Sequence, residues 1–165
     1  MMLNADGNPG TYSFLELSAK VEYALLALME LAHHPDSTRP LTLNEIAEQQ
    51  AIPERYLEHI FTMLRRGGLV QSQRGAKGGY ILTRDPWKIT LLEVLILVAG
   101  GAREGSVRGR KGQGSEASLS VERDLVREVW QQADTSSQEV LRRYTLQDLC
   151  QRRDNCKQKN PMYYI

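Results

Sequence analysis

A glycine-rich hexapeptide interrupts a chain whose apolar residues otherwise recur mostly at helical spacing. The hexapeptide, residues 74–79 (RGAKGG), stands between two short runs, 69–73 and 80–83, that have the composition of strands. Glycine-rich segments between two such runs are typical of β-hairpins. The sequence therefore predicts one small antiparallel hairpin within a mainly α-helical protein.

Three helices are predicted before this hairpin. The first starts at a capping box over 13–16 and ends before Pro35, and the second starts at a capping box over 42–45. The third spans 53–66, with Pro53 in its first turn and one of the next two glycines as its left-handed cap. The apolar stripe of the third helix consists of Leu57, Ile60, Phe61 and Leu64.

Helices are also predicted after the hairpin. A third capping box, Thr90 with Glu93, precedes an apolar helix over 91–99, and a polar, glycine-rich loop follows over 100–118. Residues 119–144 predict a long amphipathic helix that the stretch 134–137 can kink or split. Its candidates for burial are Leu125, Val126, Val129, Trp130, Ala133, Val140, Leu141 and Tyr144. A last short helix starts at Thr145, and a polar tail is expected after it.

Composition bounds the class of protein and its location. The 165 residues are 41% hydrophobic and 25% charged, which is typical of a soluble globular protein. No apolar run approaches the roughly 20 residues that span a bilayer, and the N-terminus lacks the pattern of a secretory signal. The two cysteines make no disulfide framework. We therefore expect a cytoplasmic protein without a membrane partner.

Basic residues concentrate where the third helix and the hairpin are predicted. The formal net charge of the whole chain is only +1, yet residues 52–88 hold seven basic and three acidic side chains. The basic residues are Arg55, Arg65, Arg66, Arg74, Lys77, Arg84 and Lys88. Cations on a glycine-rich tip can approach phosphates closely and release counterions. This distribution indicates a polyanion-binding surface.

The order of helix, short helix, turn, helix and hairpin is that of a winged helix-turn-helix. With its apolar stripe inward, the third helix would present Arg55, Glu58, His59, Thr62, Arg65 and Arg66 to a major groove. A solvated helix face and a plain turn explain each feature alone, but the ordered set favours DNA binding. The alternative is a winged-helix module that binds protein without specific DNA binding. No motif of an enzyme active site is present.

Three segments resemble bacterial transcription regulators of the IscR/NsrR/CymR type: VEYALLALMELA, LNEIAEQQAIPERYLEHIFTMLRRGGLVQSQRGAKGGYILTRDPWKITLLEVL and TLQDL. The most specific part is YLEHIFTMLRRGGLVQSQRGAKGGYIL. The resemblance implies a homodimer whose long C-terminal helices pair and present two winged helices to a pseudo-palindromic DNA operator. Tyr56 and Glu58 match recognition-helix positions, and Arg74 with Gly75 matches a minor-groove contact. A carboxylate at position 58 can accept a hydrogen bond from cytosine N4.

These considerations together give a predicted DNA-contact set and a domain division. The set is Arg55, Tyr56, Glu58, His59, Thr62, Arg65, Arg74, Gly75 and Lys77. The division is a flexible leader (1–12), a winged-helix DNA-binding domain (13–99), a flexible loop (100–118), a dimerisation helix with a short closing helix (119–150), and a tail (151–165).

The chain departs from the resemblance in its sulfur content. Many such regulators hold an iron–sulfur cluster through three cysteines in the loop that corresponds to 100–118, which contains none here. Glu22 stands where some members place an acidic cluster ligand, although a solvated glutamate is the more frequent case.

Cys150 and Cys156 are therefore open to three interpretations: incidental thiols, a redox-sensitive or disulfide-forming pair, and an atypical iron–sulfur site. The neighbouring Arg152, Arg153 and Lys157 predict a lowered thiol pKa. The cofactor is left open, with Cys150, Cys156 and Glu22 as the candidate metal ligands.

Overall fold

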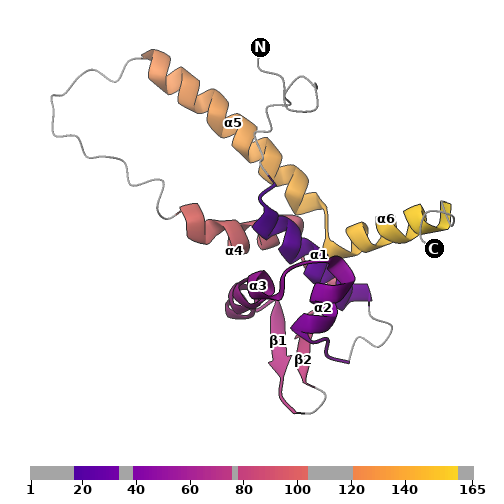
Figure 1. Cartoon of the computed structure of the whole chain (residues 1–165). Coiled ribbons are helices and arrows are strands. Elements are labelled where there is room, and N and C mark those ends of the chain that lie inside the picture. Colours follow the sequence, from indigo (N-terminus) through magenta and orange to yellow (C-terminus); the bar gives the residue numbers. More distant parts are fainter. Residues whose placement is uncertain (1–16, 34–38, 76–77, 104–120, 160–165) are drawn as a thin grey trace, which may run out of the picture.

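The computed structural model describes residues 17–33, 39–75, 78–103 and 121–159. This part of the chain is mainly helical with one two-stranded antiparallel sheet, as predicted (Figure 1). The elements are α1 (Ala19–His33), α2 (Leu43–Gln50), α3 (Glu54–Arg66), β1 (Val70–Gln73), β2 (Gly79–Leu82), η1 (Pro86–Lys88), α4 (Leu91–Arg103), α5 (Val121–Arg143) and α6 (Leu146–Lys159).

The first helix begins later than predicted. Leu17 and Ser18 are not helical, so α1 begins at Ala19 and not at Ser13. The Ser18 hydroxyl accepts a hydrogen bond from the Val21 N–H at 3.4 Å and so serves as the cap. The predicted capping box over 13–16 lies outside the described residues. The physical reason is that a second serine offers a cap immediately before the buried stripe of the helix.

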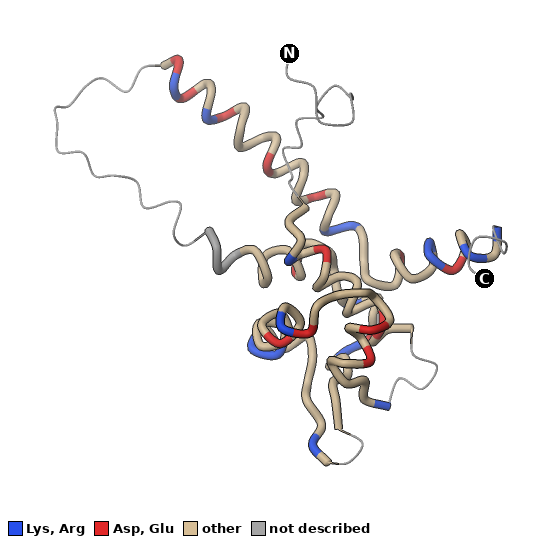
Figure 2. The backbone as a smooth tube through the Cα atoms, in the orientation of Figure 1, with Lys and Arg blue, Asp and Glu red and all other residues tan. Residues whose placement is uncertain are grey.

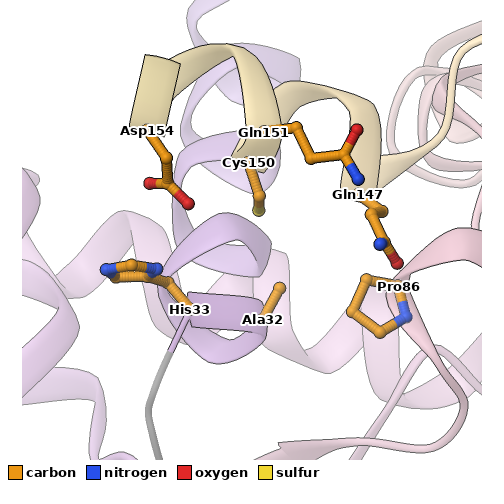
Figure 3. Close-up of a pocket in the computed structure, with 7 residues that line it drawn as sticks. All are labelled: Ala32, His33, Pro86, Gln147, Cys150, Gln151 and Asp154. Atoms are coloured by element: carbon orange, nitrogen blue, oxygen red, sulfur yellow. The ribbon is translucent and has the colours of Figure 1, made fainter. Parts of the chain in front are cut away.

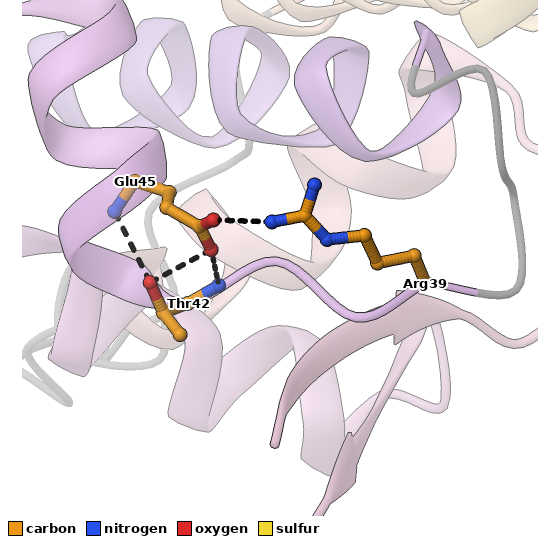
Figure 4. Close-up of polar contacts among 3 residues, drawn as sticks. All are labelled: Arg39, Thr42 and Glu45. Atoms are coloured by element: carbon orange, nitrogen blue, oxygen red, sulfur yellow. Dashed lines mark hydrogen bonds and ion pairs between the residues drawn. The ribbon is translucent and has the colours of Figure 1, made fainter. Parts of the chain in front are cut away.

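The capping box of α2 is confirmed in full. The Glu45 N–H donates to Thr42 Oγ1 at 3.2 Å, and the Thr42 N–H donates to Glu45 Oε2 at 2.8 Å (Figure 4). Arg39 binds the other carboxylate oxygen of Glu45 at 2.9 Å. The helix ends at Gln50, its C-cap Ala51 has a left-handed φ of 53°, and the turn to α3 follows.

Helix α3 and the hairpin pack as the apolar pattern predicts. Leu57, Ile60, Phe61 and Leu64 are all buried, and the Phe61 ring lies 4.6 Å from the Tyr80 ring on β2. Gly67 ends α3 in a right-handed conformation, whereas Gly68 takes the left-handed one with φ of 72°. In the hairpin, Val70 pairs with Leu82 and Gln73 pairs with Gly79.

A close approach at Gly79 attaches the segment before α2 to the sheet. Leu41 and Tyr80 exchange two backbone hydrogen bonds of 3.1 and 2.8 Å. A Cβ at position 79 would stand 2.6 Å from the Leu41 carbonyl oxygen, and the φ of Gly79 is +153°. Only glycine tolerates both conditions, so this residue lets the segment before α2 pack closely against the tip end of β2, where Gly79 pairs with Gln73.

The helix after the hairpin is longer than predicted, and its capping box is incomplete. α4 continues to Arg103 rather than ending at residue 99, so helix occupies the start of the predicted loop. The Glu93 N–H donates to Thr90 Oγ1 at 3.2 Å, but the Glu93 carboxylate binds Arg84 instead of returning to the Thr90 N–H. Arg84 therefore takes the place of the Thr90 N–H as the partner of the Glu93 carboxylate.

The C-terminal helices correct three further expectations. α5 runs unbroken through residues 134–137, so no kink or split occurs there. α6 extends to Lys159, so most of the predicted polar tail is helical. The predicted burial along α5 does not occur within one chain, because no residue of α5 is buried. Its exposed large apolar side chains are Val121, Leu125, Val126, Val129, Trp130 and Val140.

The start of α6 returns to the core, while α5 extends away from the winged-helix body (Figure 1). Leu146 is fully buried, and its N–H donates to the Ile89 carbonyl at 2.9 Å, while the Leu91 N–H donates to the Tyr144 carbonyl at 2.9 Å. The helices over the described ranges include none long and apolar enough to cross a membrane.

Candidate nucleic-acid interface

The outward face of α3 is polar and exposed. Its amphipathic sequence buries the apolar stripe against α1 and α4, which leaves Arg55, Glu58, His59 and Arg65 in contact with solvent. Thr62 is only half-exposed, and its hydroxyl donates to the Glu58 carbonyl at 2.9 Å. The hydroxyl proton of Thr62 is thus used within the helix, and its oxygen is the group left to face a ligand.

Tyr56 is supported by two neighbours at the start of α3. Its ring is 47% exposed, it lies 6.1 Å from the Tyr23 ring on α1, and the Arg55 guanidinium stands 5.0 Å from its centroid. Contacts of this kind restrict the ring to few orientations. Sequence reasoning missed Tyr23. The available signal was an aromatic residue beside the buried stripe of α1.

The wing places Arg74 at the end of β1. Arg74 is exposed, and Gly75 follows with φ of 115°, a left-handed conformation that a side chain would strain. A Cβ on Gly78 would stand 2.7 Å from the Gln73 carbonyl oxygen, so the tip is tight on both sides. The predicted contact Lys77 lies outside the described residues.

The basic residues that the structure describes within 52–88 fall into two groups. Arg55, Arg65, Arg66 and Arg74 are exposed on α3 or at the wing tip, where Figure 2 shows blue segments. Arg84 and Lys88 instead pair with acids: Arg84 with Glu93, and Lys88 with Asp85 at 2.8 Å. The surface charge available to a polyanion is therefore concentrated on α3 and the tip of the wing.

Cys150 lies in an open pocket of about 270 Å³ between the end of α1, η1 and α6 (Figure 3). His33 and Asp154 also line this pocket. Burial raises the pKa of the Cys150 thiol, and the nearby Arg153 offsets this only in part. The predicted lowering of the thiol pKa by neighbouring cations is therefore wrong for Cys150, because the loss of solvent outweighs the attraction of the cation.

The two thiols do not form a pair within one chain. Cys150 is half-buried and Cys156 is exposed on the same helix, both as free cysteines. Six residues of α-helix separate their Cα atoms by about 9 Å along the axis and place their side chains on different faces. This exceeds the reach of a disulfide, so an intrachain bridge, one part of the redox interpretation, is excluded.

The donor set does not fit an iron–sulfur cluster within a single chain. Glu22 is exposed in the first turn of α1, far in sequence from both thiols. Across residues 17–33, 39–75, 78–103 and 121–159, no group of three or more His, Cys, Asp and Glu side chains could hold a metal ion. Glu22, Cys150 and Cys156 are therefore not brought together.

Comparison with known proteins identifies the family. Residues 17–152 match the Rrf2 family, described as iron-dependent transcriptional regulators. The chain is 32% identical over 156 residues to the HTH-type transcriptional regulator IscR of Xenorhabdus nematophila, covering 89% of this chain and 92% of that protein.

Two solved structures are similar in fold and sequence. IscR from T. potens is 32% identical with a TM-score of 0.68, covering 87% of this chain and 92% of that one. CymR, the global cysteine regulator of B. subtilis, is 33% identical with a TM-score of 0.63, covering 83% and 97%. The Xenorhabdus relative is named as a transcriptional regulator and the B. subtilis protein as a regulator, and none of the three is named as an enzyme. The chain thus belongs to the Rrf2 family of transcriptional regulators.

Proposed function

We propose that this regulator is a cytoplasmic homodimer that binds a specific double-stranded DNA operator. In each protomer α3 enters a major groove and the hairpin of β1 and β2 reaches the adjacent minor groove. The observation that carries the proposal is the exposure of Arg55, Arg65, Arg66 and Arg74 on these two elements of one small domain. Exposed cations on a helix and on a glycine-rich tip supply the phosphate contacts that dominate affinity for DNA.

The contacts to DNA divide by chemistry into positioning and selecting groups. Arg55, Arg65, Arg74 and Lys77 neutralise phosphates or enter a narrow groove, while Gly75 lets the backbone approach closely. The remaining proposed contacts select or orient, and they are Tyr56, Glu58, His59 and Thr62. The Glu58 carboxylate repels phosphates and accepts a hydrogen bond from cytosine N4, so it contributes specificity more than affinity.

The exposed face of α5 supports the homodimer. Val121, Leu125, Val129 and Val140 fall within about 100° of one another around the helix, and Val126 and Trp130 extend the same side. A group of exposed apolar side chains on one side of a helix is unusual on a monomer and is typical of an interface. A second copy of α5 would cover it and place two winged helices on one side of the pair.

Any sulfur-based response of this regulator depends on Cys150 and Cys156, because the sequence contains no other cysteine. The family description names iron, but the donor set of one chain does not fit a cluster. If the thiols respond to a signal at all, they therefore do so separately or across the dimer. The alternative function, a module that binds protein without specific DNA binding, predicts no enriched DNA fragment.

The test is selection of bound DNA fragments from a random pool by the purified protein, with iron measured on the same sample. We expect a pseudo-palindromic consensus and steep salt dependence of binding. Recovery of unenriched fragments at all salt concentrations would reject sequence-specific binding and favour the protein-binding alternative. Iron content read beside the selection shows whether a metal accompanies the binding-competent form.

Two substitutions separate the proposed roles on the selected operator. Arg74→Ala removes one cation from each protomer, so the slope of log affinity against log salt should fall by about 1.8 for the dimer. Glu58→Ala should leave that slope unchanged and relax the preference at one base pair of each half-site. Unchanged slope in the first variant, together with unchanged base preference in the second, would contradict the assignment of both contacts.

A further inference from the structure

The Glu30 carboxylate on α1 lies between a side chain of α2 and a side chain of α6. The Gln50 side-chain amide, at the end of α2, donates to Glu30 Oε1 at 2.5 Å. On the other side, Arg153 Nη1 on α6 stands 4.0 Å from the same oxygen. The side chains of Glu30 and Arg153 are only 17% and 16% exposed, so water screens their attraction weakly.

Gln50 stands at the turn that sets the direction of the recognition helix. It is the last residue of α2, Ala51 follows in a left-handed conformation, and α3 begins at Glu54. A non-glycine residue in this conformation is strained and persists only where the surroundings hold it. A hydrogen bond to the residue immediately before the strained position therefore helps to define the angle between α2 and α3.

Glu30 requires a cation in this location. It lies in the last turn of α1, where a negative charge opposes the helix dipole. Its carboxylate is also largely removed from water, and such a charge is costly unless it is paired. Arg153 supplies the compensating charge from α6, while its Nε donates to the neighbouring Asp154 at 3.1 Å.

The Arg153 guanidinium is not placed by its own hydrogen bonds alone. Its Nη2 is buried without a hydrogen-bond partner among the residues the structure describes. The arginine is therefore held by the packing of α6 on α1 and by the charge of Glu30. A change in the position of α6 alters the electrostatic attraction between Arg153 and Glu30. It thereby alters the hydrogen bond between Glu30 and Gln50.

We infer that Arg153 is a positioning residue for operator binding: it holds the Glu30 carboxylate against Gln50 and so ties the C-terminal helix to the turn before α3. Only Tyr144 and Thr145 connect α5 to α6, so α6 follows the position of α5. The contacts of Glu30 with Arg153 and Gln50 then fix the direction of α3 relative to α5, the helix proposed to pair in the dimer. The inference rests on the proposed function, a dimer whose two recognition helices must match the spacing of two half-sites.

The test compares Arg153→Met with the adjacent Arg152→Met on the selected operator. Arg152 is exposed and stacks on the Tyr144 ring at 4.6 Å, so it is a matched control for loss of one charge from α6. We expect Arg153→Met to weaken operator binding about 10-fold, equivalent to about 1.4 kcal/mol. The salt slope should stay that of the wild type, and Arg152→Met should change affinity less than twofold.

A series of operators that differ in the distance between their half-sites gives a second measurement. A general loss of protein stability would not change the preference for one distance over another. Operators with the half-sites moved apart by one base pair should be rejected by the wild type and tolerated by Arg153→Met. Glu30→Gln should reproduce the defect, and the double variant should be no worse than either single variant, because both act on one link. Arg153→Lys keeps the charge and is the second variant to compare, and it should recover part of the affinity that Arg153→Met loses.

Three results would overturn the inference: wild-type affinity and spacing preference in Arg153→Met, additive defects of Arg153→Met and Glu30→Gln, or an equal loss in Arg152→Met. Failure of the proposed function is distinguishable, because then the wild type itself would select no operator. Thermal unfolding and the molecular mass of each variant confirm that folded dimers are compared.

Discussion

Replacing Val129 with aspartate places a charge in the middle of the apolar stripe of α5. The Val129 side chain is 61% exposed in the single chain, and Leu125 and Val126 lie one turn before it, both also exposed. If two copies of α5 pair through this stripe, Val129 moves from water into an apolar contact. The substitution then acts on the dimer and hardly at all on the folded protomer.

The magnitude follows from the exposed surface. Full burial of a valine side chain is worth about 1.5–3 kcal/mol, so covering the exposed three fifths gives about 1–2 kcal/mol for each protomer. The dimer therefore loses about 2–4 kcal/mol of apolar contact. Confining two unpaired carboxylates adds at least about 2 kcal/mol, and the total of at least about 4 kcal/mol raises the dimer Kd roughly 1000-fold.

Sedimentation equilibrium measures this Kd directly. The matched control is Gln131→Asp, which introduces the same residue into the same helix about 200° around its axis. The control should dimerise as the wild type does, while Val129→Asp sediments as a monomer at micromolar concentration. A Val129→Asp protein whose dimer Kd rises less than 10-fold, or no more than that of the control, would refute pairing through this stripe.

Three further outcomes are expected. Ala51→Gly should raise the free energy of unfolding by about 0.5–1 kcal/mol in urea titrations, because glycine relieves the left-handed strain at a smaller entropic cost; a loss of stability would contradict this. Hydrogen bonds from Thr145 lower the pKa of Asp148, so its contribution to stability is complete above the ordinary aspartate pKa and is lost as the pH falls through the lower native value. Asp148→Asn should therefore reduce the fall in the free energy of unfolding at acid pH, and an unchanged dependence on pH would exclude the effect. Iodoacetamide should alkylate exposed Cys156 well before Cys150, whose thiol pKa burial raises, and equal rates by mass spectrometry would contradict the assigned environment.

Features with local causes were predictable from the sequence. The capping box at Thr42 needs only residues three apart, and the stripe from Leu57 to Leu64 needs only helical periodicity. The hairpin around Gly75 follows from glycine between strand-like runs. These predictions are confirmed because the interactions that create them lie within one turn of helix or one reversal of the chain.

Features with competing local signals were predicted less well. Ser13 and Ser18 both offer a cap to the first helix, and the pattern did not show that Ser18 takes the role. The second half of α6 lacks an apolar stripe, so periodicity missed a helix composed largely of residues with good or neutral helix propensity. Glu93 was assigned to a local cap, but an arginine from the segment after β2 binds it instead.

Taken by itself, the sequence determined the order of the elements, the buried face of α3, the glycine-dependent wing and the concentration of cations on these parts, because periodicity, capping and charge are properties of neighbours in the chain. The tertiary structure alone decided that the apolar face of α5 stays open, that the pKa of Cys150 rises, and that Glu30 joins Gln50 to Arg153. Each of these depends on how much water is removed from a group by segments distant in sequence, which no local pattern records.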